Sequence, residues 1–377
     1  MAITAYTFDE GKAAAYLDLC SRLYKQDTNW IVPLRSRALS QFSREFFFYR
    51  EGGNAHRHFL ATTAGRPVGH ASAFVPSKAK NAAGQSAGLI GFFECVDDDA
   101  VASDLLGQAI DWMRAEHSIR RVWAPMQFDV WHGYRFMTRG FQERSFFGEP
   151  YNKPYYPGMF SQQGFEVCKR WYSLEIASSR QLRKLIAPCK EAYDSAVADG
   201  YRFLSIDVHD HALMASLQSA IESSYQNFLG LAPLAPDQFK KVVEAYAEAL
   251  DPRFAIVAID PAGVLSGFAI AYPDYARALN AMHGSESLIA RLSFYLRARR
   301  IRRAVFFMIG ITPTEARRRR GIGHALHYRC LDQLLAAGFE TIVFALLAED
   351  SPGWRLVENR KEEAQKEYAL YEAVFEP

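Results

Sequence analysis

Hydrophobic and polar positions along this chain follow the same plan twice, with the two copies about 198 residues apart. In the first copy, strand-like apolar runs at 59–64 and 70–75 flank a short turn that contains two glycines four positions apart. In the second copy, runs at 254–259 and 268–272 flank a turn of the same kind. Two such runs joined by a short glycine turn are typical of a β-hairpin. We therefore expect a hairpin at the corresponding place in each half.

Each copy then continues in the same order. A buried strand is followed by a helix with apolar residues at helical spacing, by a further strand and, after a short helix, by a closing strand. These elements are expected at 87–96, 100–116, 122–125 and 171–176 in the first copy, and at 304–311, 321–337, 341–347 and 368–375 in the second. A mixed sheet flanked by helices is the natural way to bury such elements, which predicts the α/β class for both halves.

The length of 377 residues suits two or three domains. A polar join at 177–180 separates the copies, and a helix-period segment at 181–199 opens the second. We therefore predict a first domain over 1–178 and a second over 179–377.

The composition is that of an ordinary globular protein and indicates no particular partner. Apolar residues make up 49% of the chain, and 44 basic against 42 acidic residues leave a net charge of +2. No apolar run approaches the roughly 18 residues of a membrane-spanning helix. The five cysteines are scattered without a CxxC pair, which favours free thiols in a reducing cytoplasm over a zinc site or a disulfide framework. We expect a cytoplasmic protein without a bound metal.

The two halves differ where the buried strand meets its helix. In the second half this junction carries four arginines, 317–320, and then Gly321 and Gly323. Glycines let a backbone approach an anion, and the first N–H groups of a helix point at it with about half a positive charge. In the first half the junction holds three acids, 97–99, which suit a helix cap and would repel a phosphate. One anion site is therefore expected, in the second half.

The spacing of Arg318, Gly321 and Gly323 resembles the pyrophosphate-binding signature of the Gcn5-related N-acetyltransferases (GNAT superfamily). The resemblance implies two tandem acyl-CoA N-acyltransferase domains, each a mixed, mostly antiparallel sheet flanked by helices, of which the first is degenerate. It implies acetyl-CoA or a longer acyl-CoA as co-substrate, its pantetheine arm pairing with the strand end at 308–311. The cofactor residues that it implies are Ile309, Ile311, Arg318, Arg320, Gly321, Ile322, Gly323, His324 and Ala325.

Two segments of the first half also resemble a bacterial subgroup of tandem GNAT proteins. They are Gly-Phe-Phe-Glu-Cys at 91–95 and Pro-Tyr-Asn-Lys-Pro-Tyr-Tyr at 150–156. That subgroup includes a ceramide synthase, which joins a fatty acyl group to a sphingoid amine. The resemblance implies a lipid amine as one class of acceptor.

Acyl transfer to an amine needs a proton acceptor for the amine and a proton donor for the leaving thiolate. The strand at 304–311 contains no acid, so the base must come from a neighbouring strand end, where Asp274 and Glu349 are the candidates. The resemblance implies a tyrosine donor in the segment 352–359, which has none. Tyr368 or Tyr371 could replace it, although both also fit a strand.

Substrate contacts are expected from two loops of the first half, with the amine acceptor in a groove between the domains. The loops at 127–135 and 149–156 are rich in groups that stack and donate hydrogen bonds. The candidate residues are Trp131, His132, Tyr134, Arg135, Tyr151 and Asn152. Simple packing of these loops is the alternative interpretation.

Arginines are denser between 297 and 320 than one pyrophosphate requires, and only Glu315 opposes them locally. The 3′-phosphate of coenzyme A could engage one or two of them. The stretch could also hold transfer RNA, as in tandem enzymes that use an aminoacyl-tRNA donor, or rest on an anionic membrane at the inner surface of the cell. The sequence thus predicts an acyl-CoA-dependent N-acyltransferase. The alternatives are aminoacyl-tRNA-dependent transfer to a small amine and a non-catalytic GNAT-like binding module.

Overall fold

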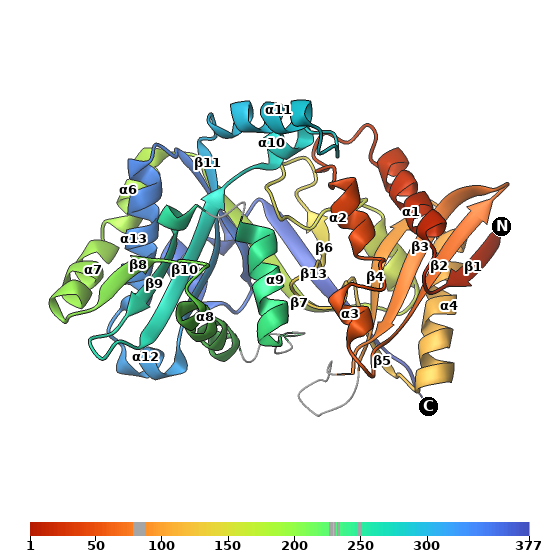
Figure 1. The fold of residues 1–377 in the computed structure, drawn as a ribbon, viewed down its shortest axis with the longest axis horizontal. Coiled ribbons are helices and arrows are strands. Elements are labelled where there is room, and N and C mark those ends of the chain that lie inside the picture. Colours follow the sequence, from red (N-terminus) through yellow and green to blue (C-terminus); the bar gives the residue numbers. More distant parts are fainter. Residues whose placement is uncertain (78–86, 226–228, 230, 232–233, 248–250, 377) are drawn as a thin grey trace. The chain divides into compact units, whose positions relative to one another are not determined.

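A computed structural model describes residues 1–376 except 78–86, 226–228, 230, 232–233 and 248–250. The described chain forms two compact units (Figure 1). The first unit comprises 1–170, 278–294 and 367–377, and the second comprises 171–277 and 295–366. Each unit is an α/β structure, so the predicted fold class is confirmed.

The first unit is built on a sheet with the strand order β1-β2-β3-β4-β5-β13, and β6 also pairs with β13. The pairs are antiparallel except β4 with β5, which are parallel. The strands are β1 (Ala2–Tyr6), β2 (Ala55–Thr63), β3 (Arg66–Val75), β4 (Gly88–Cys95), β5 (Arg121–Ala124), β6 (Phe136–Arg139) and β13 (Lys366–Val374). The helices are α1 (Glu10–Leu23), α2 (Arg35–Ser40), α3 (Phe47–Arg50), α4 (Asp99–His117) and α5 (Tyr156–Gln162).

The second unit repeats this order as β8-β9-β10-β11-β12-β7, again with one parallel pair, β11 with β12. The strands are β7 (Glu166–Ile176), β8 (Arg202–Ser205), β9 (Ala255–Ile259), β10 (Leu265–Pro273), β11 (Arg303–Ile311) and β12 (Thr341–Ala348). The helices are α6 (Ser179–Ile186), α7 (Cys189–Ala198), α8 (His211–Ser224), α9 (Pro236–Ala247), α12 (Pro313–Arg318) and α13 (Ile322–Ala336), with 3₁₀ turns η1 (Pro252–Phe254), η2 (Pro352–Val357) and η3 (Lys361–Glu363). Helices α10 (Ala276–Asn280) and α11 (Leu288–Ala298) are divided between the units.

The sixth strand of each unit comes from the other half of the sequence. In the first unit, Arg121–Ala124 pairs with the end of β13, where Tyr371 lies opposite Ala124. In the second unit, β12 pairs with the end of β7, where Ile342 lies opposite Ile176. The sequence pattern predicts both of these strands, as the last strand of each half. In the structure, β7 completes the sheet of the second unit and β13 completes that of the first. The domain boundary at residue 178 stays a prediction, because the compact units are interleaved along the chain.

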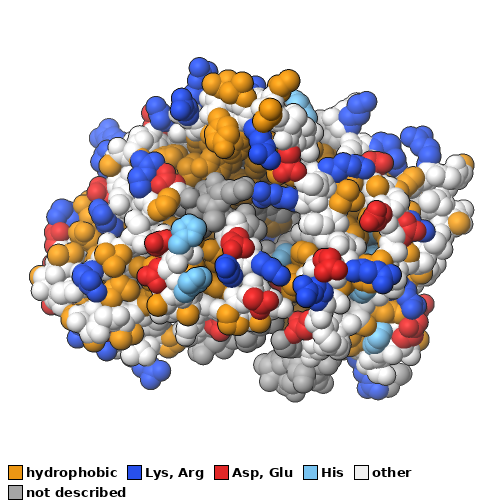
Figure 2. Space-filling model, viewed as in Figure 1, with side chains coloured by type: hydrophobic (Ala, Val, Ile, Leu, Met, Phe, Trp, Pro, Cys, Tyr) orange, Lys and Arg blue, Asp and Glu red, His pale blue; other side chains and the backbone are white. Residues whose placement is uncertain are grey.

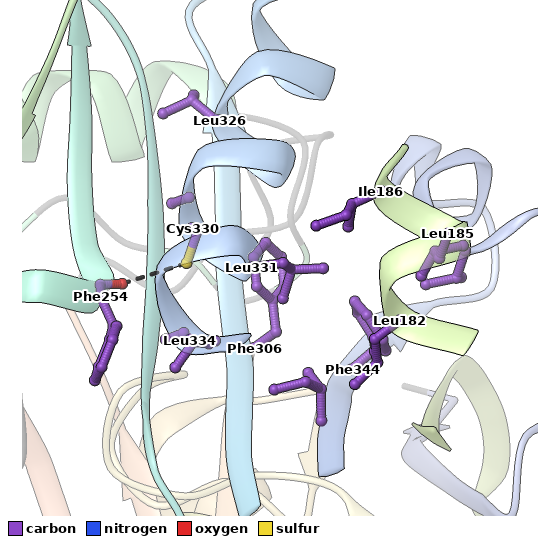
Figure 3. Close-up of a cluster of buried hydrophobic side chains, with 14 of the residues drawn as sticks. Leu182, Leu185, Ile186, Phe254, Phe306, Leu326, Cys330, Leu331, Leu334 and Phe344 are labelled. Carbon is purple, nitrogen blue, oxygen red and sulfur yellow. Dashed lines mark hydrogen bonds between the residues drawn. The ribbon is translucent and has the colours of Figure 1, made fainter. Parts of the chain in front are cut away.

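Helix α13 supplies the core of the second unit. Its apolar residues Leu326, Cys330, Leu331 and Leu334 recur at helical spacing and are fully buried (Figure 3). They belong to the same buried cluster as Phe306 of β11 and Phe344 of β12, and the Cys330 thiol donates a hydrogen bond of 3.5 Å to the carbonyl of Phe254. Truncating one such leucine to alanine typically costs about 2–5 kcal/mol. The start of α13 is therefore held firmly relative to β11.

Helix α4 has the corresponding position in the first unit, where Leu105, Leu106 and Met113 are fully buried beneath β3 and β4. The helix-period segment at 181–199 forms two helices, α6 and α7, because Pro188 lies between them and cannot continue a helix. The five cysteines are free thiols, as expected. Within the described residues, the structure contains no helix with both the length and the apolar character needed to cross a membrane.

Candidate functional site

Strand β11 separates from its parallel neighbour halfway along its length. It pairs with β12 only from Arg303 to Phe306, opposite Thr341 to Phe344. On its other edge it stays paired with β10 as far as Ile311, which lies opposite Gly267. The second half of β11, which includes the expected pantetheine-binding segment, therefore has β10 as its neighbour and diverges from β12.

The end of α8 contacts this diverging half of β11. The hydroxyl of Tyr225 donates a 2.7 Å hydrogen bond to the carbonyl of Ile309, and the hydroxyl of Ser224 donates one of 3.0 Å to the carbonyl of Ile311. A Cβ on Gly310 would lie 3.2 Å from the Cβ of Ser224 and 2.5 Å from the ring of Phe268, so this position requires a glycine. The carbonyls of Ile309 and Ile311 are thus already engaged, and each keeps one lone pair for a further donor.

The turn that follows β11 leads into the start of α13. Thr312 caps α12, Arg319 ends it with a φ of 54°, and Gly321 has a φ of 72° directly before α13 begins. A non-glycine residue at 321 would be strained by this φ. No side chain caps α13, so its first N–H groups are not bound by a capping side chain. Arg320 and His324 are exposed, whereas Ile322 and Ala325 are buried in the core.

Arg318 is held by two acids of its own unit. Its guanidinium lies 3.2 Å from Asp260 and 3.1 Å from Glu315, and these contacts, the one with Asp260 first, raise the pKa of Arg318. Glu315 is buried and accepts a 2.9 Å hydrogen bond from the hydroxyl of Tyr201. Glu315 is the acid that opposes the arginines locally, and Asp260 of the β9–β10 turn is a second acid, distant in the sequence, that contacts Arg318. Arg318 thus links the turn before α13 to the β9–β10 turn.

Arg320 is placed differently from Arg318. It is exposed, and its guanidinium donates a 3.3 Å hydrogen bond to the hydroxyl of Tyr201. Arg317 and Arg319 are exposed as well. The turn therefore presents positive charge to solvent at the uncapped start of α13.

The corresponding junction of the first unit is closed by its own side chain. Asp98 accepts hydrogen bonds from the backbone N–H groups of Ala100 (3.0 Å) and Val101 (3.4 Å) at the start of α4. The expected capping by an acid is confirmed. This helix start has a carboxylate where an anion would have to bind.

The structure places Asp274 and Glu349 at opposite ends of the sheet of the second unit, and Tyr368 in the first unit. Asp274 follows β10 at the end of the sheet opposite the start of α13. At about 3.3 Å per strand residue, it lies roughly 25 Å from Ile311. It is buried, and its carboxylate lies 2.5 Å from Arg303. Glu349 follows β12 at the same end as Ile311 and is exposed. Tyr368 lies in the first unit, fully buried, where its hydroxyl donates to Glu149.

The expected substrate residues all lie in the first unit, and several have structural partners. The amide of Asn152 accepts from the N–H of Met137 (2.7 Å) and donates to the carbonyls of Met137 and Lys153, so its hydrogen-bonding capacity is largely used. Tyr134 and Arg135 are buried and bonded to each other. Asn152, Tyr134 and Arg135 thus have structural partners, and their contact with a substrate stays a prediction.

The remaining expected substrate residues are partly accessible. Tyr151 donates to Asp27 at 2.8 Å, and Trp131 is partly exposed. His132 lies 2.7 Å from Asp129 and packs against the ring of Phe47 at 4.8 Å. These three stay candidates for contacts with a substrate.

Glu94 of β4 is a buried carboxylate that is not among the residues predicted from the sequence. This carboxylate accepts a 2.7 Å hydrogen bond from the hydroxyl of Tyr156 and one of 3.3 Å from that of Tyr24. Burial raises its pKa to about 7, against the opposing effects of these two hydrogen bonds and of the nearby Lys153 charge. Two features of the sequence point to Glu94. It is a lone acid within an otherwise apolar strand, and its hydrogen bond to Tyr156 joins the segments 91–95 and 150–156.

No family model matches the chain. Among curated proteins it is 22% identical to the protein YghO of Escherichia coli (strain K12) over 372 residues, covering 95% of this chain and 92% of that protein. It is also 22% identical to the bacterial ceramide synthase of Caulobacter vibrioides over 314 residues, covering 81% and 79% respectively.

Among solved structures, the chain is similar to a tandem GNAT protein from the clavulanic acid biosynthesis pathway. The TM-score is 0.57 at 11% identity, covering 100% of this chain and 99% of that one. A GCN5-related N-acetyltransferase from Sphaerobacter thermophilus gives a TM-score of 0.52 at 11% identity, covering 100% and 96%. The resemblance seen in the sequence is confirmed at the level of the fold: this chain has the fold of the tandem Gcn5-related N-acetyltransferases.

Proposed function

We propose that this protein is an N-acyltransferase that takes an acyl group from a coenzyme A thioester and transfers it to an amine. The supporting observation is the start of α13 in the second unit. Its first N–H groups have no side-chain cap, and exposed arginines adjoin them. The preceding strand has separated from its neighbour at this point. Free N–H groups and positive charge at a helix start favour the binding of an anion such as the diphosphate of coenzyme A.

Gly323 gives a second argument for a ligand at this helix start. A Cβ at this position would make only an ordinary contact, 3.7 Å from the side chain of Ile311. The protein itself therefore does not require a glycine here, in contrast to Gly321 with its positive φ. Close approach of a bound diphosphate to the helix accounts for the missing side chain.

Transfer of the acyl group from the thioester to the amine defines the groups that the site needs. The amine nitrogen attacks the thioester carbonyl, the C–S bond breaks, the amine loses a proton, and the thiolate gains one. Backbone N–H groups at the end of β11 would polarise the carbonyl. Of the candidate acids in the second unit, Glu349 stays a proposal for the base, because it lies at the same end of the sheet as the α13 start.

The acceptor that we propose is a lipid amine, with acetyl-CoA or a longer acyl-CoA as the donor. The bacterial ceramide synthase among the relatives supports an acceptor of this class. The segments 91–95 and 150–156, which resemble that subgroup, meet through Glu94 and Tyr156 in the first unit.

Isothermal titration calorimetry with coenzyme A tests the donor site. Gly323→Glu places a bulky negative side chain at the start of α13 and is expected to abolish binding. Ala100→Glu is the matched control, since Ala100 is the second residue of α4, is exposed and needs no repacking. Val101 is unsuitable as a control, because it is buried. Unchanged affinity in Gly323→Glu would refute the site.

A thermal-shift comparison separates the three functions that the sequence allows. Acetyl-CoA and palmitoyl-CoA should stabilise the protein, and charged tRNA should not. Stabilisation by charged tRNA alone would favour aminoacyl-tRNA-dependent transfer. No response to any of the three would favour a non-catalytic module.

A further inference from the structure

Helix α11 carries its large apolar side chains on the outside. Five of its eleven residues are large hydrophobics that are more than half exposed. They are Leu288 (85% exposed), Ile289 (83%), Leu292 (60%), Tyr295 (65%) and Leu296 (59%). The other exposed large hydrophobic side chains in the described part of the chain are scattered. An exposed cluster of this kind marks a surface that another partner covers.

The five side chains form one continuous face. At 100° per residue, positions 288, 289, 292, 295 and 296 fall within an arc of about 120°. Ala290 is the buried residue of α11, and it projects on the opposite side of the helix. The helix therefore packs on its protein through a narrow side and presents its wide apolar face to solvent. We call these five residues the α11 apolar face.

Exposed arginines lie on α11 and directly after it. At 100° per residue, Arg291 lies about 40° beyond the edge of the α11 apolar face, whereas Arg297 lies on the side of Ala290. Arg299, Arg300 and Arg302 follow the end of the helix, and all five arginines are exposed. In Figure 2, hydrophobic and basic side chains occur side by side at the top of the view, where Figure 1 shows α11. From 286 to 303 the sequence has one acid, Glu286, and its carboxylate accepts a hydrogen bond from Ser36. The chain therefore carries exposed basic side chains close in sequence to the α11 apolar face.

We propose that α11 docks this protein on an anionic lipid bilayer, with the α11 apolar face among the acyl chains and the arginines at the phosphate groups. An amphipathic helix with apolar and basic residues lies in the plane of the membrane interface in this way. Eleven residues are too few to span a bilayer. A second protein copy fits less well, because the cores of protein interfaces are depleted in charge and five like charges would oppose their own copies. The inference does not depend on the proposed function.

Vesicle flotation tests the proposal with the full-length protein. Wild-type protein is expected to float with phosphatidylcholine vesicles that contain phosphatidylglycerol, and about tenfold less with phosphatidylcholine alone. High salt should weaken binding to the anionic vesicles, because it screens the arginines. Failure of the wild-type protein to float with anionic vesicles would overturn the proposal without the use of any variant.

Two variants separate the apolar from the charged contribution. Leu288→Glu combined with Leu292→Glu should reduce binding at least tenfold, since two side chains that enter the acyl-chain region in the proposed complex become charged. Arg299→Gln combined with Arg300→Gln should remove most of the preference for anionic vesicles. Val197→Glu, at an exposed apolar residue of α7, is the matched control and should bind as wild type does.

Sedimentation without lipid distinguishes a second copy from a membrane. A monomer in wild type and in both variants is the expected result. A dimer that disappears in the Leu288→Glu, Leu292→Glu variant would assign the α11 apolar face to self-association and overturn the proposal. Unaltered flotation of that variant, with its fold verified by circular dichroism, would overturn it as well.

Discussion

The hydroxyl of Tyr156 donates a 2.7 Å hydrogen bond to the carboxylate of Glu94, which joins the start of α5 to the end of β4. The same hydroxyl accepts a 2.9 Å hydrogen bond from the N–H of Cys95. Burial raises the pKa of Tyr156 well above its ordinary value and that of Glu94 to about 7. The first unit, although its helix start is capped by Asp98, thus contains a carboxyl group able to exchange a proton near neutral pH.

Replacing Glu94 should change how stability depends on pH. Because the pKa is raised in the folded state, that state binds more protons than the unfolded chain between pH 4.5 and about 7. The stabilising contribution is therefore present at low pH and lost as the pH rises towards 7, by up to about 3 kcal/mol. Glu94→Gln should remove this fall. Urea unfolding across this pH range measures it.

Glu143→Gln, at an exposed carboxylate of the same unit, is the control and should keep the wild-type slope. An identical slope in Glu94→Gln and wild type would contradict the raised pKa.

Gly323→Ala should separate stability from ligand binding. Alanine is favoured over glycine within a helix by about 1 kcal/mol, and the new Cβ meets only the Ile311 side chain at 3.7 Å. The variant should therefore unfold at a higher temperature while it binds coenzyme A more weakly, because the methyl group lies where the diphosphate approaches. Calorimetry and thermal unfolding give the two values. A variant that is more stable and binds with unchanged affinity would place the ligand elsewhere.

Asp274 should behave as a structural residue. Its carboxylate lies 2.5 Å from Arg303, and both side chains are buried. In Asp274→Asn, Glu175 is the remaining carboxylate that pairs with Arg303, and its side chain is 35% exposed. Because the buried Arg303 charge is then only partly compensated, the free energy of unfolding should fall by about 3 kcal/mol. Coenzyme A affinity of the folded variant should equal that of wild type. A large loss of affinity with unchanged stability would restore Asp274 as a site residue.

His327 should make the second unit sensitive to acid. Burial, followed by repulsion from His324, lowers the pKa of His327 to about 3, and its ring lies 3.9 Å from the sulfur of Cys189. Since the pKa is lowered in the fold, the stabilising contribution is present above pH 6.5 and lost as the pH falls towards 3, by up to about 5 kcal/mol.

His327→Leu should flatten this part of the stability profile, measured by urea unfolding between pH 6.5 and 3. The exposed His324 on the same helix provides the control, His324→Gln, which should keep most of the slope. Equal slopes in wild type and His327→Leu would show that the ring is not kept neutral by burial.

Local features of the fold could be predicted from the sequence, because periodicity and turn residues act over short distances. Both hairpins, both central strands, helices α4 and α13, and the cap at Asp98 agree with the expectation. Pairing of β13 with β5 could not be predicted, since a strand pattern shows which face is apolar and not which partner it has.

The same limit applies to the candidate site. The glycines and the arginines of the α13 start are visible as a motif, and the left-handed backbone at Gly321 explains one of them. The hydrogen bond from Arg318 to Asp260 could not be predicted, because it joins residues 58 positions apart and depends on where the fold places the β9–β10 turn. Asp274 follows a strand, as the sequence indicates, but β10 is antiparallel to β11, so Asp274 lies at the end of the sheet opposite Ile311.

The interleaved sheets have a consequence for how the protein is made. On the ribosome, the first half emerges with six of its seven strands and must wait for residues 367–374, which follow the second half's own strands in the sequence, before its sheet is complete. The second half, in contrast, finds β7 already translated when β12 appears. The half that is synthesised first is therefore the one that finishes folding last.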